Sequence, residues 1–487
     1  MNKIGLFKYS NHLGAFNPFY FKDQNGFKFD QSFKGIINKY NEPIELDVTA
    51  IVSVLNKHYI LGDRTLIKGI KRSPWMAYPD KKNSAWKFHK LPAHGSERKT
   101  AEEVSEKVFQ LFCGELEDYL HTSKSVGILL SGGMDSRMVA GVLDYLIKNK
   151  RTRIKRVVAY TWGNESSRDV VYSKKIANRL GWEWQHFFIN ESKLKRNFEI
   201  AGMRGCEYSG LHLHGMPDIA NAADVDVVLA GSYGDSVGRA EYSGSHVTEL
   251  KPIDSGIRNF AYLINKQFYN MVKGNWKKDV EKYDRVFPRN KDYQKYELER
   301  QLHYMRRMLN PCMEVIHEKV PLRQAFTSPA LFGYMWSLSP ACRNNDLYKY
   351  LPKYFETDLS DIPWARTGLP YGKKSGTPDD FNKKHHSYSY YMQEVLLDHI
   401  YDKINGSNLS VINKKQSLKL INLIRKQPYH NFDYLEAIAW VYSFCVFIDE
   451  YDIENVERED VTNVLSNILL TAEYSFKRNA RKVKSFM

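Results

Sequence analysis

The chain has 487 residues, of which 43% are hydrophobic and 14% aromatic, a composition typical of a folded globular protein rather than a disordered one. It contains no apolar run of the ~18 residues that a membrane-spanning helix needs, so no membrane association is expected. The net charge of +15 suits a nucleotide, an acidic substrate or nucleic acid as a partner.

The five cysteines are scattered and never form a C-x-x-C pair, and the N-terminus carries no apolar signal core. These features predict reduced thiols in a cytoplasmic protein without a zinc ribbon or a disulfide framework. The one dense basic cluster, 477–484, has no interleaved aromatic residues. It is more simply interpreted as a solvated tail than as a nucleic-acid-binding segment.

The first hundred residues have a mixed, aromatic-rich pattern, and the Lys/Asn-rich stretch near 80–98 is predicted to be a linker. Beyond it, short apolar runs alternate with helical patterns. The expected strands cover 126–130, 157–162, 184–189 and 224–230. The expected helices cover 135–149 and 168–180, and Gly181 ends the second. This alternation predicts an α/β fold, a parallel sheet with flanking helices whose ligands bind beyond the carboxyl ends of the strands.

Strand signals fade after about residue 250, and long helical patterns replace them. These patterns cover 292–308, 388–403, 414–426, 431–449 and 458–472. The second half of the chain is therefore predicted to be an all-helical lobe.

Residues 131–136 have the sequence Ser-Gly-Gly-Met-Asp-Ser and join an expected strand to an expected helix. The first N–H groups of a helix lack partners within it, and the helix dipole favours an anion there. Two glycines let a polyanion approach the backbone, and serine hydroxyls add donors. The segment lacks the Gly-Lys-Ser/Thr ending of a Walker P-loop. It predicts a site for the pyrophosphate end of ATP, and the alternative is a plain helix cap made by Asp135 or Ser136.

A second glycine turn, 231–236, follows the fourth expected strand and carries Asp235. Because parallel strands end at the same edge of a sheet, Asp135 and Asp235 are expected at one edge. Two carboxylates beside a triphosphate favour a Mg²⁺ site, and the metal would neutralise charge on the departing pyrophosphate. The alternative is that Asp235 only caps a turn.

These segments resemble the PP-loop ATP pyrophosphatases and, in their order, the synthetase half of the asparagine synthetase superfamily, which includes amide ligases of the beta-lactam synthetase and lasso-peptide cyclase type. The similar segments are 46–70, 131–136, 169–181, 231–235 and, more weakly, 305–322. The resemblance implies an adenine nucleotide alpha hydrolase-like fold. It also implies three regions: a short degenerate N-terminal region without a glutaminase (1–95), the nucleotide-binding α/β part (96–250) and the helical part of the synthetase domain (251–487).

The resemblance implies a reaction in which ATP and a carboxylate form an acyl-adenylate, which ammonia or an amine then attacks as AMP leaves. ATP and Mg²⁺ are the implied cofactors, with Asp135 and Asp235 as metal ligands. The implied pyrophosphate contacts are Ser131, Gly132, Gly133 and Ser136. The implied adenosine contacts are Leu129, Leu130, Thr161 and Gly231, and Asp169 is expected to face the phosphates.

The chain departs from the family pattern in three regions. Asn2 stands where the glutaminase half has its cysteine, so the chain is not expected to hydrolyse glutamine by itself. Ser232 and Ser236 replace two glutamates of the asparagine-forming members. Tyr233 lies one residue from the position of a tyrosine that helps to deprotonate the amine in related cyclases. The segment 319–324 lacks the family's acid, so the substrate contacts are not expected to be those for aspartate.

A basic group near the α-phosphate would stabilise the transition state, and the family uses a lysine of the helical lobe. The candidates here are Arg366, Lys373 and Lys374, in a glycine-containing loop that could close over ATP. Arg306 aligns with a family arginine, and His303, one turn earlier, is a candidate proton acceptor. Glu299 is the alternative base. The pair His212 and His214, expected on one strand face, has no third ligand and is not predicted to bind a metal.

The sequence thus predicts an ATP-dependent, AMP-forming amide ligase that acts on a carboxylate substrate with ammonia or an amine as donor. A separate glutaminase partner is one conceivable source of ammonia. The first alternative is an RNA-modifying PP-loop enzyme similar to tRNA lysidine synthetase or a tRNA thiolase, although nucleic acid is the less favoured partner. The second is a non-catalytic relative that binds a nucleotide.

Overall fold

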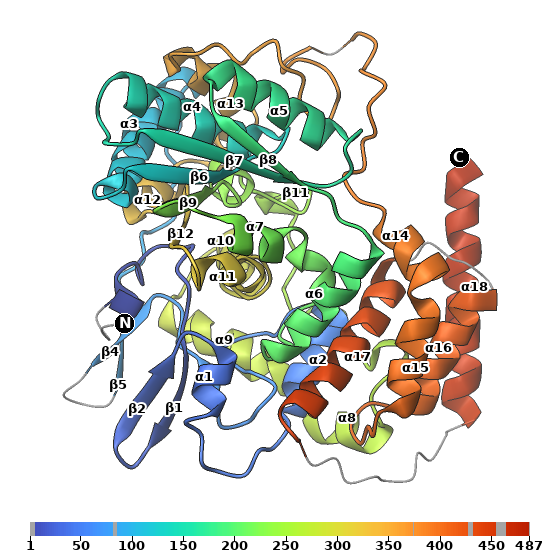
Figure 1. The fold of residues 1–487 in the computed structure, drawn as a ribbon. Coiled ribbons are helices and arrows are strands. Elements are labelled where there is room, and N and C mark those ends of the chain that lie inside the picture. The colour runs from blue at the N-terminus through green and yellow to red at the C-terminus, as the bar shows by residue number, and fades with distance from the viewer. Residues whose placement is uncertain (1–4, 81–84, 374, 427–431, 454–463, 487) are drawn as a thin grey trace.

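A five-stranded parallel sheet lies at the centre of one half of the molecule (Figure 1). The computed structural model describes residues 5–80, 85–373, 375–426, 432–453 and 464–486. The strands, in spatial order, are β12 (Leu322–Gln324), β9 (Val227–Ala230), β6 (Ser125–Leu129), β7 (Arg156–Trp162) and β8 (Glu183–Phe187). Every neighbouring pair is parallel. The predicted parallel α/β sheet is therefore confirmed.

The central strands β9, β6 and β7 are mainly apolar, as expected for strands that are covered on both faces. Val126 and Ile128 of β6 pack on one face against α3 (Ala101–Leu120), α4 (Met134–Lys148) and α5 (Arg168–Leu180). Leu129 packs on the other face with α7 (Met216–Ala222) and α11 (Asn310–His317). The sheet is therefore a rigid layer whose strand ends are fixed by packing from both sides.

Helix α5 has the bounds that the sequence predicts, and Gly181 ends it in the left-handed conformation with φ of 70°. Strand β9 begins later than predicted, at Val227. The cause is Asp226, whose carboxylate accepts hydrogen bonds from the backbone N–H groups of Lys124 and Ser125 at 2.7 and 2.9 Å. This turn holds the start of β9 level with the start of β6.

Three predictions about local structure were wrong. Strand β12 was not expected, because only three residues long and with two polar residues it carries no apolar-run signal. The segment around His212 and His214, expected as a strand, forms a 3₁₀-helix (Gly210–Leu213). The expected linker near 80–98 contains β5 (Ala85–Phe88), which pairs with β4 (Ala77–Asp80).

The N-terminal region is built into the fold rather than appended to it. Its elements are a 3₁₀-turn (Gly5–Phe7), β1 (Phe19–Asp23), β2 (Gly26–Asp30), α1 (Phe33–Ile37), α2 (Val48–Lys57) and β3 (Lys71–Arg72). Strand β1 lies between β2 and β3 in an antiparallel sheet. Residues of β1 and α2 share one hydrophobic core with α6 (Glu191–Met203) and with helices near the C-terminus.

The second half of the chain is mainly helical, as predicted. Its helices are α8 (Lys266–Val272), α9 (Trp276–Val286), α10 (Asp292–Glu299), a π-helix (Arg300–Leu309), α11, α12 (Pro329–Ser337), α13 (Leu347–Tyr350), α14 (Tyr388–Tyr390), α15 (Leu397–Gly406), α16 (Lys414–Lys426), α17 (Phe432–Glu450) and α18 (Val464–Phe486). The parts of the predicted helices at 431 and 458–463 lie outside the described residues.

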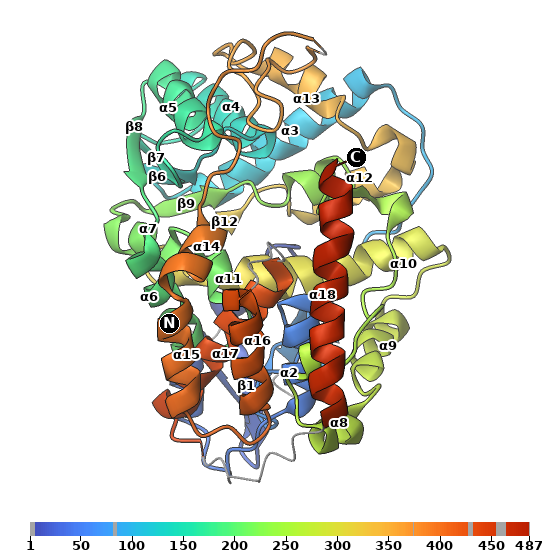
Figure 2. The same cartoon turned by 90° about the vertical axis from the view of Figure 1, so that its right-hand side faces the viewer.

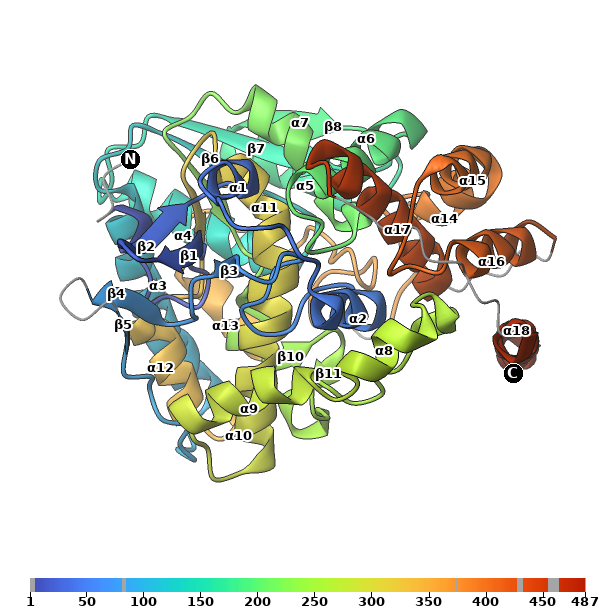
Figure 3. The ribbon, with the colours of Figure 1, turned by 90° about the horizontal axis from the view of Figure 1, so that it is seen from below.

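The helical half does not form one separate lobe. β12, α11 and α12 belong to the sheet side of the molecule, whereas α15, α16 and α17 pack with α2 and α6. Figure 2 shows α18 running along the outside, and Figure 3 shows α15, α16 and α18 together at one side, away from the sheet. Among the residues that the structure describes, no helix is both long and apolar enough to cross a membrane.

A buried ion network joins the N-terminal region to the helices under the sheet. The Arg72 guanidinium at the end of β3 binds Glu314 of α11 through two hydrogen bonds of 2.9 Å and Glu207 at 2.7 Å. Glu207 also accepts from Arg307 at 2.8 Å. All four side chains are almost fully buried. The charges are thus mutually dependent, because none can be solvated if its partner is removed.

We predict that Arg72→Met lowers the free energy of unfolding by about 3–5 kcal/mol, because it leaves two buried carboxylates short of a counter-charge. Lys68→Met is the matched control, since Lys68 pairs with Glu45 at 2.6 Å on the exposed surface and should cost under about 1 kcal/mol. Urea denaturation measures both. Equal losses in the two variants would contradict the structural role given to Arg72.

Candidate nucleotide-binding site

The two glycine turns lie at a topological switch point of the sheet. From β6 the chain proceeds through α4 and α5 to β7 and β8 on one side, and then returns to β9 on the other side of β6. The turns that follow β6 and β9 therefore leave adjacent strands in different directions (Figure 1). Crevices at such points, outside the carboxyl ends of the strands, are where open α/β sheets bind ligands.

Asp135 and Asp235 converge at this point. The Tyr348 hydroxyl donates to Oδ1 of Asp135 and lies 3.5 Å from Oδ1 of Asp235. The turns themselves touch, because a Cβ added to Gly234 would lie 2.5 Å from Oδ1 of Asp135. The sequence placed both acids at one edge of the sheet, and they do lie there, close enough to share one hydroxyl.

Positive charge around the acids comes mainly from Arg239. Its guanidinium forms an ion pair with Asp235, one helical turn away, and binds Glu241 at 2.6 Å. Arg366 reaches the same Glu241 at 2.6 Å. Burial raises the pKa of Asp135 to about 7, Arg239 and Arg366 oppose this shift and Glu241 adds to it. Burial therefore outweighs the effect of the two guanidinium groups on Asp135.

The glycine loop is closed by its two serines. The Ser136 hydroxyl accepts from the Ser131 N–H at 3.1 Å, and the Ser131 hydroxyl accepts from the Gly133 N–H at 3.1 Å. No side-chain cap hydrogen bond forms at Gly133, the N-cap of α4, and the Ser136 hydroxyl binds the Ser131 N–H, so the phosphate role of this loop stays a prediction. The Gly133 N–H already donates to Ser131, whereas the helix dipole at this terminus still favours an anion.

Gly132 has a packing role in this loop. A Cβ there would lie 2.9 Å from the Arg168 carbonyl oxygen and 3.0 Å from the Ala365 Cβ. Its own carbonyl accepts from the Ala365 N–H at 3.1 Å. Any contact of Gly132 with pyrophosphate is therefore restricted to backbone atoms that these neighbours leave open.

The residues expected around the adenosine occupy different environments. Leu129 and Leu130 belong to the cores on opposite faces of the sheet, and Thr161 is buried with its hydroxyl donating to the Leu130 carbonyl at 2.8 Å. Gly231 packs against Asp135, whose carbonyl carbon would be 3.1 Å from an added Cβ. These contacts make Thr161 and Gly231 supports of the strand ends, and their contact with adenosine stays a prediction.

Asp169 lies near the glycine loop, at the start of α5. Burial raises its pKa, while His385 and the backbone of Gly132 lower it. The backbone of Gly132, in the glycine loop, thus helps to orient the Asp169 carboxylate. Its expected place facing the phosphates stays a prediction.

The loop after residue 362 contains the cationic candidates. Arg366 is bound to Glu241 and stacks near the Trp364 ring, with 5.3 Å from its Cζ to the ring centroid. Lys373 is exposed, but its neighbour Tyr371 lies against the Tyr348 ring, 6.0 Å between centroids. Lys374 lies outside the described residues. The loop therefore borders the two acids, and Arg366 is the cation fixed beside them.

The residues of the second turn face different surroundings. The Ser232 hydroxyl is half-buried and lies 3.7 Å from the Met313 sulfur. Tyr233 is fully buried, and its hydroxyl donates to the Leu13 carbonyl and to the Asn310 side chain, each at 3.2 Å. This placement gives Tyr233 a core role and offers no support for its suggested part in amine deprotonation.

Glu299, His303 and Arg306 are brought to the N-terminal region and not to the acid pair. The Gly62 N–H donates to His303 Nδ1 at 2.9 Å, and Arg306 binds Asp63 at 2.9 Å. Burial lowers the pKa of His303 to about 3 and raises that of Glu299 to about 7. Both line a separate cavity of about 180 Å³ beside Trp75. The sequence predicted one shared helix face; His303 and Arg306 contact Gly62 and Asp63, whereas Glu299 accepts from the Ile253 N–H at 2.8 Å.

Three residues of the site were missed at the level of sequence. Arg239 lies four positions after Asp235, a spacing that pairs charges on one helical turn, so a signal for it existed. Glu241 follows from the same argument once Arg239 is placed. Tyr348 is distant in sequence and stands in no motif, so only the packing of α13 against α3 brings it to the acids.

Comparison with known proteins identifies the family. Residues 110–354 match the asparagine synthase family, which is half of the chain, and the chain belongs to this family. Its members are ATP-dependent amide ligases with a PP-loop domain, and they generally use ATP and Mg²⁺.

Individual relatives are distant. A putative glutamine-hydrolyzing asparagine synthetase of Methanocaldococcus jannaschii is 23% identical over 198 residues, 39% of this chain and 34% of the relative. The Bos taurus asparagine synthetase is 30% identical over 92 residues, 19% of this chain and 16% of the relative. The matched part thus spans about a third or less of the curated relatives. A solved structure, the U34-tRNA thiolase NcsA of Methanococcus maripaludis with its 4Fe-4S cluster, is 13% identical over 75% of this chain and 86% of that chain, with a TM-score of 0.22.

We predict that Asp135→Asn stabilises the protein more at pH 8 than at pH 5 in the absence of nucleotide. The folded protein holds the Asp135 proton up to about pH 7, whereas the unfolded chain loses it near its ordinary pKa. The stability contributed by this group is therefore full at low pH and is lost as the pH rises through 7. Asparagine avoids that loss, which we expect to be worth about 1–3 kcal/mol at pH 8.

Urea denaturation at the two pH values measures the difference. Asp224→Asn serves as the control, because Asp224 is fully exposed at the opposite end of β9. A gain for Asp135→Asn that is equal at pH 5 and pH 8 would show that burial does not raise the pKa of this carboxyl.

Proposed function

We propose that the protein is an ATP-dependent, AMP-forming amide ligase. A carboxylate oxygen of the substrate attacks the α-phosphorus of ATP, the bond to the β-phosphate oxygen breaks and pyrophosphate leaves. The nitrogen of ammonia or of an amine then attacks the acyl carbon, the bond to AMP breaks, and the nitrogen gives up a proton. The observation that carries this proposal is the convergence of Asp135 and Asp235 beside the glycine loop, in a chain of the asparagine synthase family.

The residues at the switch point fit Mg²⁺ and a polyphosphate. Mg²⁺ prefers one or two carboxylates completed by phosphate oxygens and water, and Asp135 and Asp235 are the carboxylates that would hold it. When bound, the metal neutralises charge on the phosphates. Ser131, Gly133 and Ser136 surround the uncapped terminus of α4. Their hydroxyl and N–H groups would bind the pyrophosphate.

Arg366 is the cation that we assign to the α-phosphate. A fixed positive group stabilises the charge that develops there only if its position is set before the reaction. Arg366 is anchored on Glu241 and acts on the charge of Asp135. Lys373 is exposed and forms no ion pair within the described part of the chain, so its approach to ATP would require the loop to close.

Arg239 also takes part in the proposed binding of the metal. Its guanidinium pairs with Asp235 and so offsets the repulsion between the two carboxylates. Binding of the metal requires Asp235 to exchange this partner, with Glu241 and Asn345 retaining the guanidinium at 2.6 and 2.8 Å.

We predict that Asp135→Asn and Asp235→Asn each abolish ATP–pyrophosphate exchange supported by a carboxylic acid panel. Losing either carboxylate should cost at least about 10²-fold, since it removes a ligand of the metal that balances the phosphate charge. Asp224→Asn, at the other end of β9, should keep the wild-type exchange rate.

Full exchange in the Asp135 variant would disprove the metal assignment. If the wild-type protein binds ATP but catalyses no exchange with any acid, the ligase proposal fails and the non-catalytic alternative takes its place. Binding of tRNA that added salt releases would favour the RNA-modifying alternative.

We also predict that Arg366→Gln lowers kcat of exchange by at least about tenfold with a smaller change in the KM for ATP, because the group acts on developing charge. Lys373→Gln, in the same loop and with the same loss of charge, should have the smaller effect. Steady-state exchange kinetics compare the two. The reverse order of effects would transfer the assignment to the lysine.

A further inference from the structure

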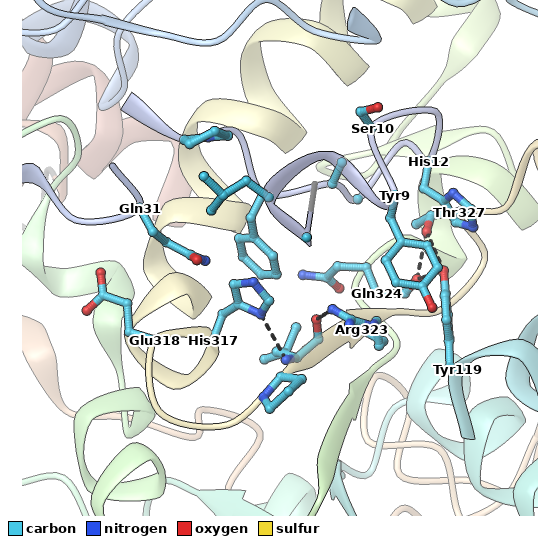
Figure 4. A pocket seen from close by; sticks show the side chains of 18 of the residues that line it. Tyr9, Ser10, His12, Gln31, Tyr119, His317, Glu318, Arg323, Gln324 and Thr327 are labelled. Carbon is cyan, nitrogen blue, oxygen red and sulfur yellow. Dashed lines mark hydrogen bonds between the residues drawn. The ribbon is translucent and has the colours of Figure 1, made fainter. Parts of the chain in front are cut away.

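A cavity of about 180 Å³ lies between the N-terminal segment and strand β12. Figure 4 shows its wall: Tyr9 and His12 come from the N-terminal segment, and Arg323 and Gln324 come from β12. The Phe16 and His317 rings stack at 4.2 Å and form an apolar side of the same cavity. The cavity thus has aromatic walls, and the Arg323 guanidinium is part of its lining.

Arg323 has no counter-ion. In the described parts of the chain its guanidinium forms no ion pair, its Nε is buried without a hydrogen-bond partner, and its single hydrogen bond goes to the neighbouring Leu322 carbonyl at 3.3 Å. Its Cζ lies 4.5 Å from the centroid of the Tyr9 ring. A guanidinium held against an aromatic face with free donors is prepared for an anion, above all for a planar carboxylate.

The charged groups around the cavity do not fill this role. Glu318 is paired with Arg204 at 2.5 Å. Glu115 accepts from the Thr327 and Ser328 N–H groups. Burial lowers the pKa of His12 to about 4 and that of His317 to about 3, so both rings are neutral at pH 7. Among the described residues, Glu318 and Glu115 thus have other partners, Asp118 acts on His12, and Arg323 forms no ion pair, while Lys319 adds a second positive charge at the rim.

The inner wall of the cavity adjoins the turn that carries Asp235. Gln324 lies in register with Ala230, the last residue of β9. The Gln324 amide nitrogen is 3.0 Å from the Met313 sulfur, and the Ser232 hydroxyl contacts the same sulfur at 3.7 Å. The Gln324 amide oxygen is buried without a partner. Gln324 on the side of the cavity and Ser232 in the nucleotide-binding turn thus contact the same side chain, Met313.

We propose that this cavity binds a substrate of the ligase through a free carboxylate held by Arg323, with an apolar or aromatic body between Tyr9 and Phe16. The role of this ligand as a substrate rests on the proposed function, whereas the binding of a carboxylate to Arg323 does not. Residues of the segment 319–324 form part of the cavity wall and carry this positive charge.

Calorimetric titration of the full chain with phenylacetate, without nucleotide, tests the binding. We expect a millimolar dissociation constant and binding at least about tenfold weaker for phenylacetamide, which has the same shape without the charge. Arg323→Gln should weaken phenylacetate binding at least about tenfold, and Arg323→Lys should restore part of it. Lys319→Gln, the same loss of charge at the exposed rim, should leave the affinity within about twofold.

Thermal unfolding of each variant verifies that it is folded. No binding of phenylacetate to the wild-type protein, equal binding of the amide, or undiminished binding by Arg323→Gln would each overturn the proposal. Since no nucleotide is present, these results are independent of the fate of the ligase assignment.

The substrate role has its own test. With an acid that supports ATP–pyrophosphate exchange, phenylacetate should inhibit competitively against that acid in the wild-type protein and at least about tenfold less in Arg323→Gln. Binding of phenylacetate without competition would refute the substrate role. If no acid supports exchange, the ligase proposal fails while the titration still decides whether Arg323 binds carboxylates.

Discussion

Two carboxylates share one small volume at the carboxyl ends of β6 and β9, and the arrangement around them follows from that constraint. Parallel pairing of the two strands fixes the distance between the turns, and the absence of a Cβ at Gly234 lets the second turn lie against Asp135. Like charges this close are tolerated only with counter-charge or a proton. Arg239 and the Tyr348 hydroxyl provide for this in the free protein.

The same constraint couples the acids to the loop above them. The buried Arg137 guanidinium in α4 donates to the Ile362 and Pro363 carbonyls at 2.7 and 2.8 Å, next to the loop that carries Arg366. Ala365 in turn donates to Gly132. These hydrogen bonds join the loop after residue 362 to the glycine loop at the start of α4.

The sequence was sufficient where local chemistry decides the structure. The apolar runs of β6, β7 and β9, the Gly181 stop and the edge on which Asp135 and Asp235 lie all follow from burial and backbone rules. It was insufficient where distant segments meet. No motif near Tyr348 indicates that it contacts the acids, and β12, with three residues, has no apolar pattern. Glu299 and His303 line a cavity beside Trp75, and hydrophobic periodicity cannot predict which distant segment a helix packs on.

The proposed ligase function depends most on the binding of one divalent cation by both acids together with a nucleotide. The direct measurement is a crystal structure with Mn²⁺ and an ATP analogue whose α and β phosphates are joined by a methylene group, with the metal located by its anomalous scattering. We expect one manganese peak at coordination distance from Asp135, from Asp235 and from phosphate oxygens. We also expect that Arg239 no longer contacts Asp235. A nucleotide bound elsewhere, or a metal that leaves Asp235 paired with Arg239, would contradict this proposal.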